Sequence, residues 1–155
     1  MLYRNVLEGI MPLRAGFDVD RFGRFGKDHL PGLLGLVITE VSEGLVTGEL
    51  PLRPALLAPN GYLHAGTIVA FADTLSGYGC IAHLPAGAEN FTTLELKANF
   101  LNTAREGMLY GEARAVHLGR STHVWDAVVT HGEERRKLAL FRCTQLVLYP
   151  KSERP

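Results

Sequence analysis

One apolar stretch, residues 65–83, is the longest helical pattern in a chain whose other long segments predict β-strands. Within it, Ile68, Phe71, Leu75 and Tyr78 recur at helical spacing and predict a bulky face that packs into a core. Another side of the helix carries small residues around one acid: Gly66, Ala70, Asp73, Ser76, Gly77 and Cys80. A single long helix with one bulky face leaves the strands to form a layer against it.

Alternation of apolar and polar residues predicts strands on both sides of the helix. In residues 91–101, for example, Leu94, Leu96, Ala98 and Phe100 alternate with polar neighbours. Strands are expected near 33–41, 45–52, 91–101, 107–118, 122–131 and 136–149. Because the breaks between the later strands are short, we expect an antiparallel meander. The order β-β-α-β-β-β-β predicts an α+β fold, with one long helix against one antiparallel sheet.

The N-terminal part of the chain has a different composition. Residues 2–13 place apolar side chains at helical spacing and predict a short amphipathic helix. Residues 14–32 are rich in glycine and predict a loop. We therefore expect residues 1–32 to form an N-terminal helix and loop, and residues 33–150 to form the domain that carries the sheet.

Composition excludes several classes of protein. The formal net charge is zero, which argues against a nucleic-acid binder, because those usually carry a basic excess. No stretch reaches the roughly 18 apolar residues of a membrane span, and charges interrupt the apolar run at the N-terminus, unlike in a signal peptide. Cys80 and Cys143 lack CxxC spacing and predict buried thiols in a reducing compartment. The expected location is the cytoplasm.

Asp73 needs an explanation, because an unpaired carboxylate costs several kcal/mol to bury in an apolar helix. Nine residues upstream, His64 stands in the segment 60–66, which predicts a loop that turns into the helix. A helix start directs free N–H groups at whatever docks there. The pair predicts an electrophile bound at the helix start, with the carboxylate as acid/base or nucleophile.

The other chemical motifs are missing or weak. The sequence contains no GxSxG, GxxxxGK[ST], GxGxxG or HExxH motif. The six histidines show no metal-ligand spacing, so no zinc site is expected. His117, His123 and His131 are interpreted as surface or packing residues, and Trp125 as a core or subunit-interface residue.

Four segments together resemble the hotdog-fold acyl-CoA thioesterases, and within them the PaaI type, named for phenylacetate degradation. Residues 60–66 are similar to that family's N-G…H-G-G entry, and residues 71–80 to its L-A-D-T-A…Y-A-C helix. Residues 93–101 resemble its first strand after the helix, and residues 138–142 its last strand. The resemblance covers roughly residues 33–149 and implies a hotdog fold, in which the antiparallel sheet wraps the central helix.

The resemblance implies hydrolysis of an acyl-CoA thioester to a free acid and CoA. Asp73 would act as nucleophile or as general base for water, and these alternatives stay open. The backbone N–H of Ala65, next to Gly66 at the helix start, would polarise the thioester carbonyl. His64 would support the loop. Asn60 would replace an amide side chain that the family often has six residues before the histidine.

Further roles follow from the same resemblance. Thr93 lies where a partner subunit's strand supplies a hydroxyl. Arg120, Ser121 and Thr122 lie where the family contacts the nucleotide phosphates of CoA. The resemblance implies a homodimer with active sites at the subunit interface, commonly paired into a homotetramer. CoA is part of the substrate, and no metal or redox cofactor, nucleic acid or membrane is expected. Residues 22–27 either cover the acyl site as a lid or pack their aromatic rings on the sheet.

Three departures from the family pattern keep two alternative functions open. Ala58, Ala65 and Gly77 occupy positions where family members often have an amide, a glycine and a hydroxyl. One alternative is a hotdog-fold dehydratase or hydratase of hydroxyacyl thioesters. The other is a protein that binds acyl-CoA without turnover.

Overall fold

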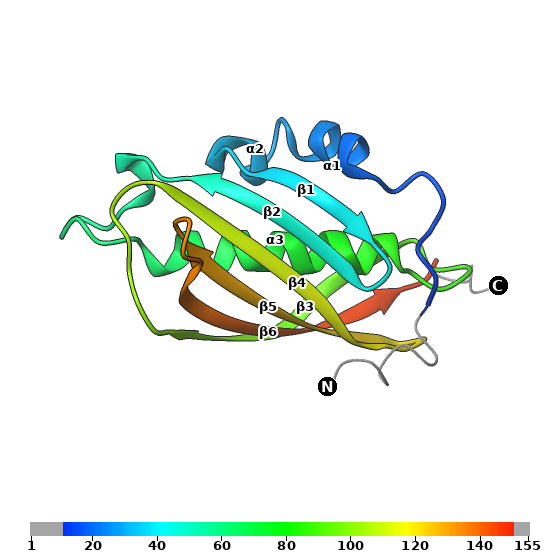
Figure 1. The fold of residues 1–155 in the computed structure, drawn as a ribbon. Coiled ribbons are helices and arrows are strands. Elements are labelled where there is room, and N and C mark those ends of the chain that lie inside the picture. Colours follow the sequence, from blue (N-terminus) through cyan, green and yellow to red (C-terminus); the bar gives the residue numbers. More distant parts are fainter. Residues whose placement is uncertain (1–10, 151–155) are drawn as a thin grey trace.

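The computed structural model describes residues 11–150 and shows a six-stranded antiparallel sheet curled around one long helix (Figure 1). The order of helix and strands agrees with the predicted β-β-α-β-β-β-β, preceded by two short helices. The elements are α1 (Val19–Gly26), α2 (Leu30–Leu34), β1 (Val37–Ser42), β2 (Leu45–Pro51), η1 (Pro54–Leu56), α3 (Ala65–Ala82), β3 (Asn90–Phe100), β4 (Met108–Leu118), β5 (Thr122–His131) and β6 (Arg136–Leu148).

The strands follow the order β1-β2-β4-β5-β6-β3 across the sheet, so the prediction of a simple meander is wrong for β3. Strands β4, β5 and β6 do form a meander, but β3 pairs with β6 at the far edge. The break around residues 105–107 belongs to a longer connection that carries the chain across the sheet (Figure 1). Backbone bonds from Leu52 to Gly107 and from Leu63 to Ala104 fix this connection. The crossing lets the sheet enclose α3 from both sides.

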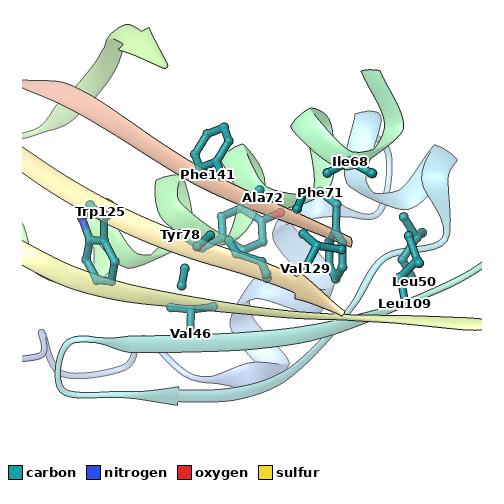
Figure 2. Close-up of a cluster of buried hydrophobic side chains, with 14 of the residues drawn as sticks. Val46, Leu50, Ile68, Phe71, Ala72, Tyr78, Leu109, Trp125, Val129 and Phe141 are labelled. Carbon is teal, nitrogen blue, oxygen red and sulfur yellow. The ribbon is translucent and has the colours of Figure 1, made fainter. Parts of the chain in front are cut away.

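The bulky face of α3 packs into the concave side of the sheet, as predicted. Ile68, Phe71, Leu75 and Tyr78 are all buried, and Figure 2 shows three of them among side chains from the strands. The helix approaches closely at Gly111 of β4, where an added Cβ would lie 2.4 Å from a methyl group of Leu75. Glycine at this position therefore sets how deeply the helix lies in the sheet.

Two short helices replace the loop that was predicted for residues 14–32. Asp18 caps α1 by accepting a hydrogen bond from the backbone N–H of Arg21. The ring of Phe22 stacks on Tyr78 of α3, with centroids 4.3 Å apart. Helix α1 was not predicted because its two glycines, Gly23 and Gly26, are typical of a loop. Gly26 nevertheless suits this position in the helix, because a Cβ there would lie 2.4 Å from the Tyr78 hydroxyl. The segment thus packs its aromatic rings against α3, while Phe25 stays 56% exposed.

The remaining expectations about the framework have mixed outcomes. The helix predicted over 2–13 lies mostly outside the described residues, and residues 11–14 are not helical. The boundary predicted between residues 32 and 33 falls inside α2. Cys80 and Cys143 are free and buried, as expected. Within residues 11–150, no helix has the length and apolar composition that crossing a bilayer requires.

Candidate active site

The start of α3 presents one backbone amide without a protein acceptor. His64 is the N-cap, and its Nδ1 accepts a hydrogen bond from the Gly66 N–H at 2.8 Å. The His64 N–H itself donates to the Leu56 carbonyl, which also accepts from the Thr67 hydroxyl. In the part of the chain that the structure describes, no acceptor is found for the Ala65 N–H. This exposed helix start can therefore donate to a docked carbonyl oxygen.

The loop that leads into α3 is held by its own turn. Asn60 uses its Oδ1 to accept from the Tyr62 N–H at 3.2 Å, and Gly61 adopts a φ of 81°. Leu57 and Leu63 pair as an isolated bridge on either side of this turn. The structure therefore places Asn60 on the exposed tip of the loop, where its carbonyl oxygen is engaged in the turn.

Asp73 lies on the third turn of α3 and is half-buried between this helix and β3. The Thr93 hydroxyl donates to Asp73 Oδ1 across a distance of 3.4 Å. Burial raises the pKa of Asp73 above its usual value, and the Thr93 hydrogen bond partly opposes this rise. The hydroxyls of Thr74 and Ser76 donate to carbonyls one turn earlier in their own helix. A half-buried carboxylate with a raised pKa and one hydroxyl donor is suited to accept a proton.

The carboxylate and the free amide stand apart on the same helix. Eight residues separate Asp73 from Ala65, and the helical rise places them about 12 Å apart along the axis. One thioester carbonyl is too small to contact both groups of a single chain. The structure thus brings Asp73 together with Thr93, and His64 with Gly66, as two separate pairs.

The position one turn after Asp73 is filled by an aromatic ring from β3. A Cβ at Gly77 would lie 2.9 Å from Cζ of Phe91, so the ring occupies the space that a side chain would take there. Ring and carboxylate are thus one helical turn apart, at the same edge of the sheet. Phe91 was not among the predicted site residues. The signal in the sequence was Gly77, because a glycine in a helix leaves room for a side chain from a neighbouring strand.

The predicted CoA-binding residues lie where β4 turns into β5, with Arg120 and Ser121 in the turn and Thr122 as the first residue of β5. The Arg120 carbonyl accepts from the Tyr149 hydroxyl at 2.7 Å, and the Thr122 carbonyl accepts from the Gly119 N–H. The side chains of Arg120 and Ser121 are exposed. Among the described residues, no hydrogen bond joins this turn to Asp73. Within one chain the turn is therefore separate from the carboxylate.

A group of buried polar side chains was missed at the C-terminal half of α3. His83 accepts from the Gly44 N–H with Nε2, and its Nδ1 bonds the Gly79 carbonyl at 2.8 Å. These bonds define its neutral tautomer. His123 and Gln145 are also fully buried on the helix side of the sheet. Strand alternation offered a signal, because His123 shares its face with Trp125.

The site has no features of a metal centre. Among residues 11–150, no three His, Cys, Asp or Glu side chains lie close enough together to hold a metal ion. Burial raises the pKa of both cysteine thiols to about 12, so they stay protonated near neutral pH.

Comparison with known proteins gives these residues a context. A family model described as the thioesterase superfamily matches residues 60–137, half of the chain, including the start of α3 and Asp73. The 1,4-dihydroxy-2-naphthoyl-CoA hydrolase of Listeria monocytogenes is 32% identical over 111 residues, which are 72% of this chain and 89% of that protein.

Solved structures share the whole architecture. A mutant of thioesterase PA1618 from Pseudomonas aeruginosa is 29% identical and matches with a TM-score of 0.83, covering 89% of this chain and 99% of that chain. The PaaI protein of Escherichia coli is 21% identical, with a TM-score of 0.73 over 83% of this chain and 90% of that chain, and shows the same fold. With its central helix, its curled sheet and these matches, the chain belongs to the thioesterase superfamily and has the hotdog fold.

Proposed function

We propose that the protein hydrolyses an acyl-CoA thioester to a free acid and CoA, as a thioesterase of the PaaI type. The observation that carries the proposal is the half-buried Asp73 carboxylate on α3, with a raised pKa and a hydroxyl donor, in a chain of the thioesterase superfamily. The naphthoyl-CoA hydrolase relative supports a CoA ester as substrate.

Two routes of hydrolysis use the same carboxylate. As a general base, Asp73 takes a proton from water, the hydroxide attacks the thioester carbon, and the C–S bond breaks to release CoA and the acid. As a nucleophile, Asp73 attacks the carbon itself, the C–S bond breaks to expel CoA as its thiolate, and water then opens the resulting anhydride to give the acid and a proton for the thiolate. In both routes the carbonyl oxygen becomes negative, and the Ala65 N–H would donate to it. His64 holds the helix start by capping Gly66.

A site built from two subunits could bring an Asp73 carboxylate and an Ala65 amide close enough to act on one thioester. Asp73 and Ala65 of one chain are about 12 Å apart along α3, so a second copy with its helix antiparallel would bring its own helix start to Asp73. The edge strand β3 supports this arrangement, because it presents the exposed apolar side chains Leu94, Leu96 and Phe100, and Leu94 directly follows Thr93, which bonds the carboxylate. We propose that two chains pair along β3 to form a homodimer and that two such dimers associate into a homotetramer.

The remaining parts of the proposal follow from exposure and chemistry. Arg120 and Ser121 are exposed in the turn and Thr122 is half-buried at the start of β5, and this set of one cation and two hydroxyls suits the phosphates of the CoA nucleotide. Neither Asp73 nor the helix start needs a metal or redox cofactor for this reaction. Free, buried cysteines suit a reducing compartment, and we place the enzyme in the cytoplasm.

The first experiment measures free-thiol release from aromatic, short-chain and long-chain acyl-CoAs by wild type and Asp73→Asn. The variant should lose at least a hundredfold in rate, about 2.7 kcal/mol, because amide nitrogen neither takes the proton nor attacks. Acyl-CoA binding and oligomeric state should stay near wild type. Glu95→Gln is the matched control, since Glu95 lies on the outer face of β3 and bonds Thr144.

The possible outcomes separate the functions that the sequence left open. Thiol release that only Asp73→Asn loses supports a thioesterase. Hydration or alkene formation without thiol release would show a dehydratase or hydratase. Saturable binding without any turnover would show a binding protein, and equal release by both proteins would refute the role of Asp73.

A further inference from the structure

A single row of side chains runs across three strands behind Asp73. Thr93 of β3 is the register partner of Gln145 of β6, and Gln145 is in turn the register partner of His123 of β5. Register partners in an antiparallel sheet point to the same face, with Cβ atoms about 5 Å apart. That face is the helix side, because Thr93 bonds Asp73, and Gln145 Nε2 lies 3.9 Å from the position of a Cβ at Gly77.

The inner two members of the row are buried polar groups without partners. Gln145 and His123 have no exposed surface. Among the described residues, the amide nitrogen and oxygen of Gln145 and both ring nitrogens of His123 make no hydrogen bond. Buried polar groups in folded proteins are nearly always bonded, so this group needs an explanation. The two side chains are neighbours in register, and the row ends at the carboxylate of the proposed active site.

The donors and acceptors of the row can be arranged as one chain of hydrogen bonds that ends at Asp73. An ionised carboxylate only accepts hydrogen bonds, so the Thr93 hydroxyl donates its proton to Asp73. The lone pairs on the Thr93 oxygen remain free to accept. The Gln145 amide can donate to those lone pairs and still accept at its oxygen. A neutral His123 has one N–H to donate to that oxygen. Each unpartnered group thus has a complementary neighbour in the row, although the structure shows no bond between them.

We propose that His123, Gln145 and Thr93 form a directed hydrogen-bond relay that positions the Asp73 carboxylate: His123 N–H to Gln145 Oε1, Gln145 Nε2–H to Thr93 Oγ1, and Thr93 Oγ1–H to Asp73 Oδ1. Gln145 and His123 are positioning residues, because they act through Thr93. Only the effect on turnover rests on the proposed function. Of its three bonds, the structure forms the one from Thr93 to Asp73, and the other two require the Gln145 and His123 side chains to rotate.

The groups near the relay include the Gly119 backbone, which offers the His123 ring an alternative hydrogen-bond partner. The Cys143 thiol of β6 lies near Asp73 and stays protonated, and Glu95 of β3 bonds Thr144 on the outer face. At the other end, His83 at the end of α3 and His117 of β4 face His123, and His83 is already bonded to Gly44 and Gly79. Burial and these histidines lower the pKa of His123 to about 4, so the ring is neutral near pH 7.

Successive donation along a chain polarises each bond and strengthens the last one. The Thr93 hydroxyl should therefore bond the charged form of Asp73 more strongly than an isolated threonine would. This bond favours the carboxylate over the protonated acid and holds it in one orientation. Loss of the relay should raise the pKa of Asp73 and lower kcat, with little change in KM.

The test compares Gln145→Met, which keeps the shape of the side chain and removes its hydrogen bonds, with wild type. The acid limb of the pH–rate profile should move up by about half a pH unit or more, and kcat should fall several-fold. Thr144→Val is the control, because Thr144 is the next residue of β6 and points to the outer face. His123→Gln, which keeps a donor, should preserve the profile, whereas His123→Leu should shift it.

The titration of Asp73, followed by carboxyl carbon NMR, tests the relay without turnover. Gln145→Met should raise the titration midpoint, and the same change in a Thr93→Val background should add nothing, since the relay is already cut. Equal midpoints in wild type and Gln145→Met would overturn the relay even if the protein is a thioesterase. A shifted midpoint in a protein that hydrolyses no CoA ester would keep the relay and reject the proposed function.

Discussion

At the scale of single residues, buried His123 should set a limit on stability in acid. Burial and two nearby histidines lower its pKa from 6.5 to about 4, while the Gly119 backbone partly opposes the shift. The unfolded chain therefore binds an extra proton between these two pH values, and stability falls as the pH falls. We expect the free energy of unfolding to drop by about 3 kcal/mol from this residue between pH 6.5 and 4.

Urea unfolding of wild type and His123→Gln at pH 4, 5, 6 and 7 measures this contribution. The variant lacks the titrating ring, so its stability should fall less steeply over this range. His29→Gln is the matched control, because His29 is exposed at the start of α2 and its replacement removes no buried imidazole. Parallel curves for wild type and His123→Gln would show that the acid sensitivity lies elsewhere.

Which residues the sequence could reveal depends on how local their signal is. Asp73 was identified because one carboxylate in an apolar helix conflicts with its surroundings, and His64 because it precedes a helix start. Whether these residues act in catalysis stays a prediction. Gln145 and His123 were missed as a row because their neighbourhood arises only from strand register, which no local pattern encodes.

At the scale of elements, Gly23 of α1 and Gly79 of α3 have contrasting surroundings. Replacing each with alanine tests how tightly each helix packs. A Cβ at Gly79 of α3 would lie 2.5 to 2.8 Å from three ring atoms of Trp125, which is fully buried. At Gly23 of α1 nothing lies within 4 Å. Alanine favours a helix by about 1 kcal/mol over glycine, but overpacking a core costs about 1–3 kcal/mol.

Gly79→Ala should therefore lower the free energy of unfolding by about 1 kcal/mol or more, because Trp125 has no room to move. Gly23→Ala should raise it by up to about 1 kcal/mol. Thermal and urea unfolding of the two variants beside wild type check both signs. A stabilised Gly79→Ala would mean that the ring shifts freely and that the helix does not rest on it.

The elements themselves were largely predictable because their periodicities are local. The helix expected over 65–83 is found at Ala65–Ala82, and the six strands lie close to their predicted positions. Helix α1 was not predicted because Gly23 and Gly26 resemble a loop, whereas its stability comes from packing on Tyr78. The position of β3 was wrong because strand order is decided by long-range pairing.

At the scale of the whole molecule, the β3 edge should decide the oligomeric state. Leu94 is 56% exposed on this edge strand, close to other exposed apolar side chains. A lysine there would place a charge in the proposed subunit interface and should shift the protein toward monomers. If the active site needs two chains, thioester hydrolysis should fall at least tenfold with it.

Light scattering after size-exclusion chromatography, together with thiol release, tests this expectation. Leu33→Lys is the matched control, because Leu33 is 71% exposed on α2 and lies away from the β3 edge. That variant should keep the oligomeric state and activity of wild type. An unchanged, active oligomer in Leu94→Lys would place the interface on another surface.

The crossing of β3 to the far edge also matters while the chain is being made. Phe100 pairs with Ala139 and Asn90 with Leu148, so β3 leaves the ribosome long before its partner strand exists. At about 5–20 residues per second, this delay lasts for several seconds. During that interval an apolar strand has no neighbour on either side. Newly synthesised chains should therefore need a chaperone most at this stage, and rare codons between β3 and β6 should lower the yield of soluble protein.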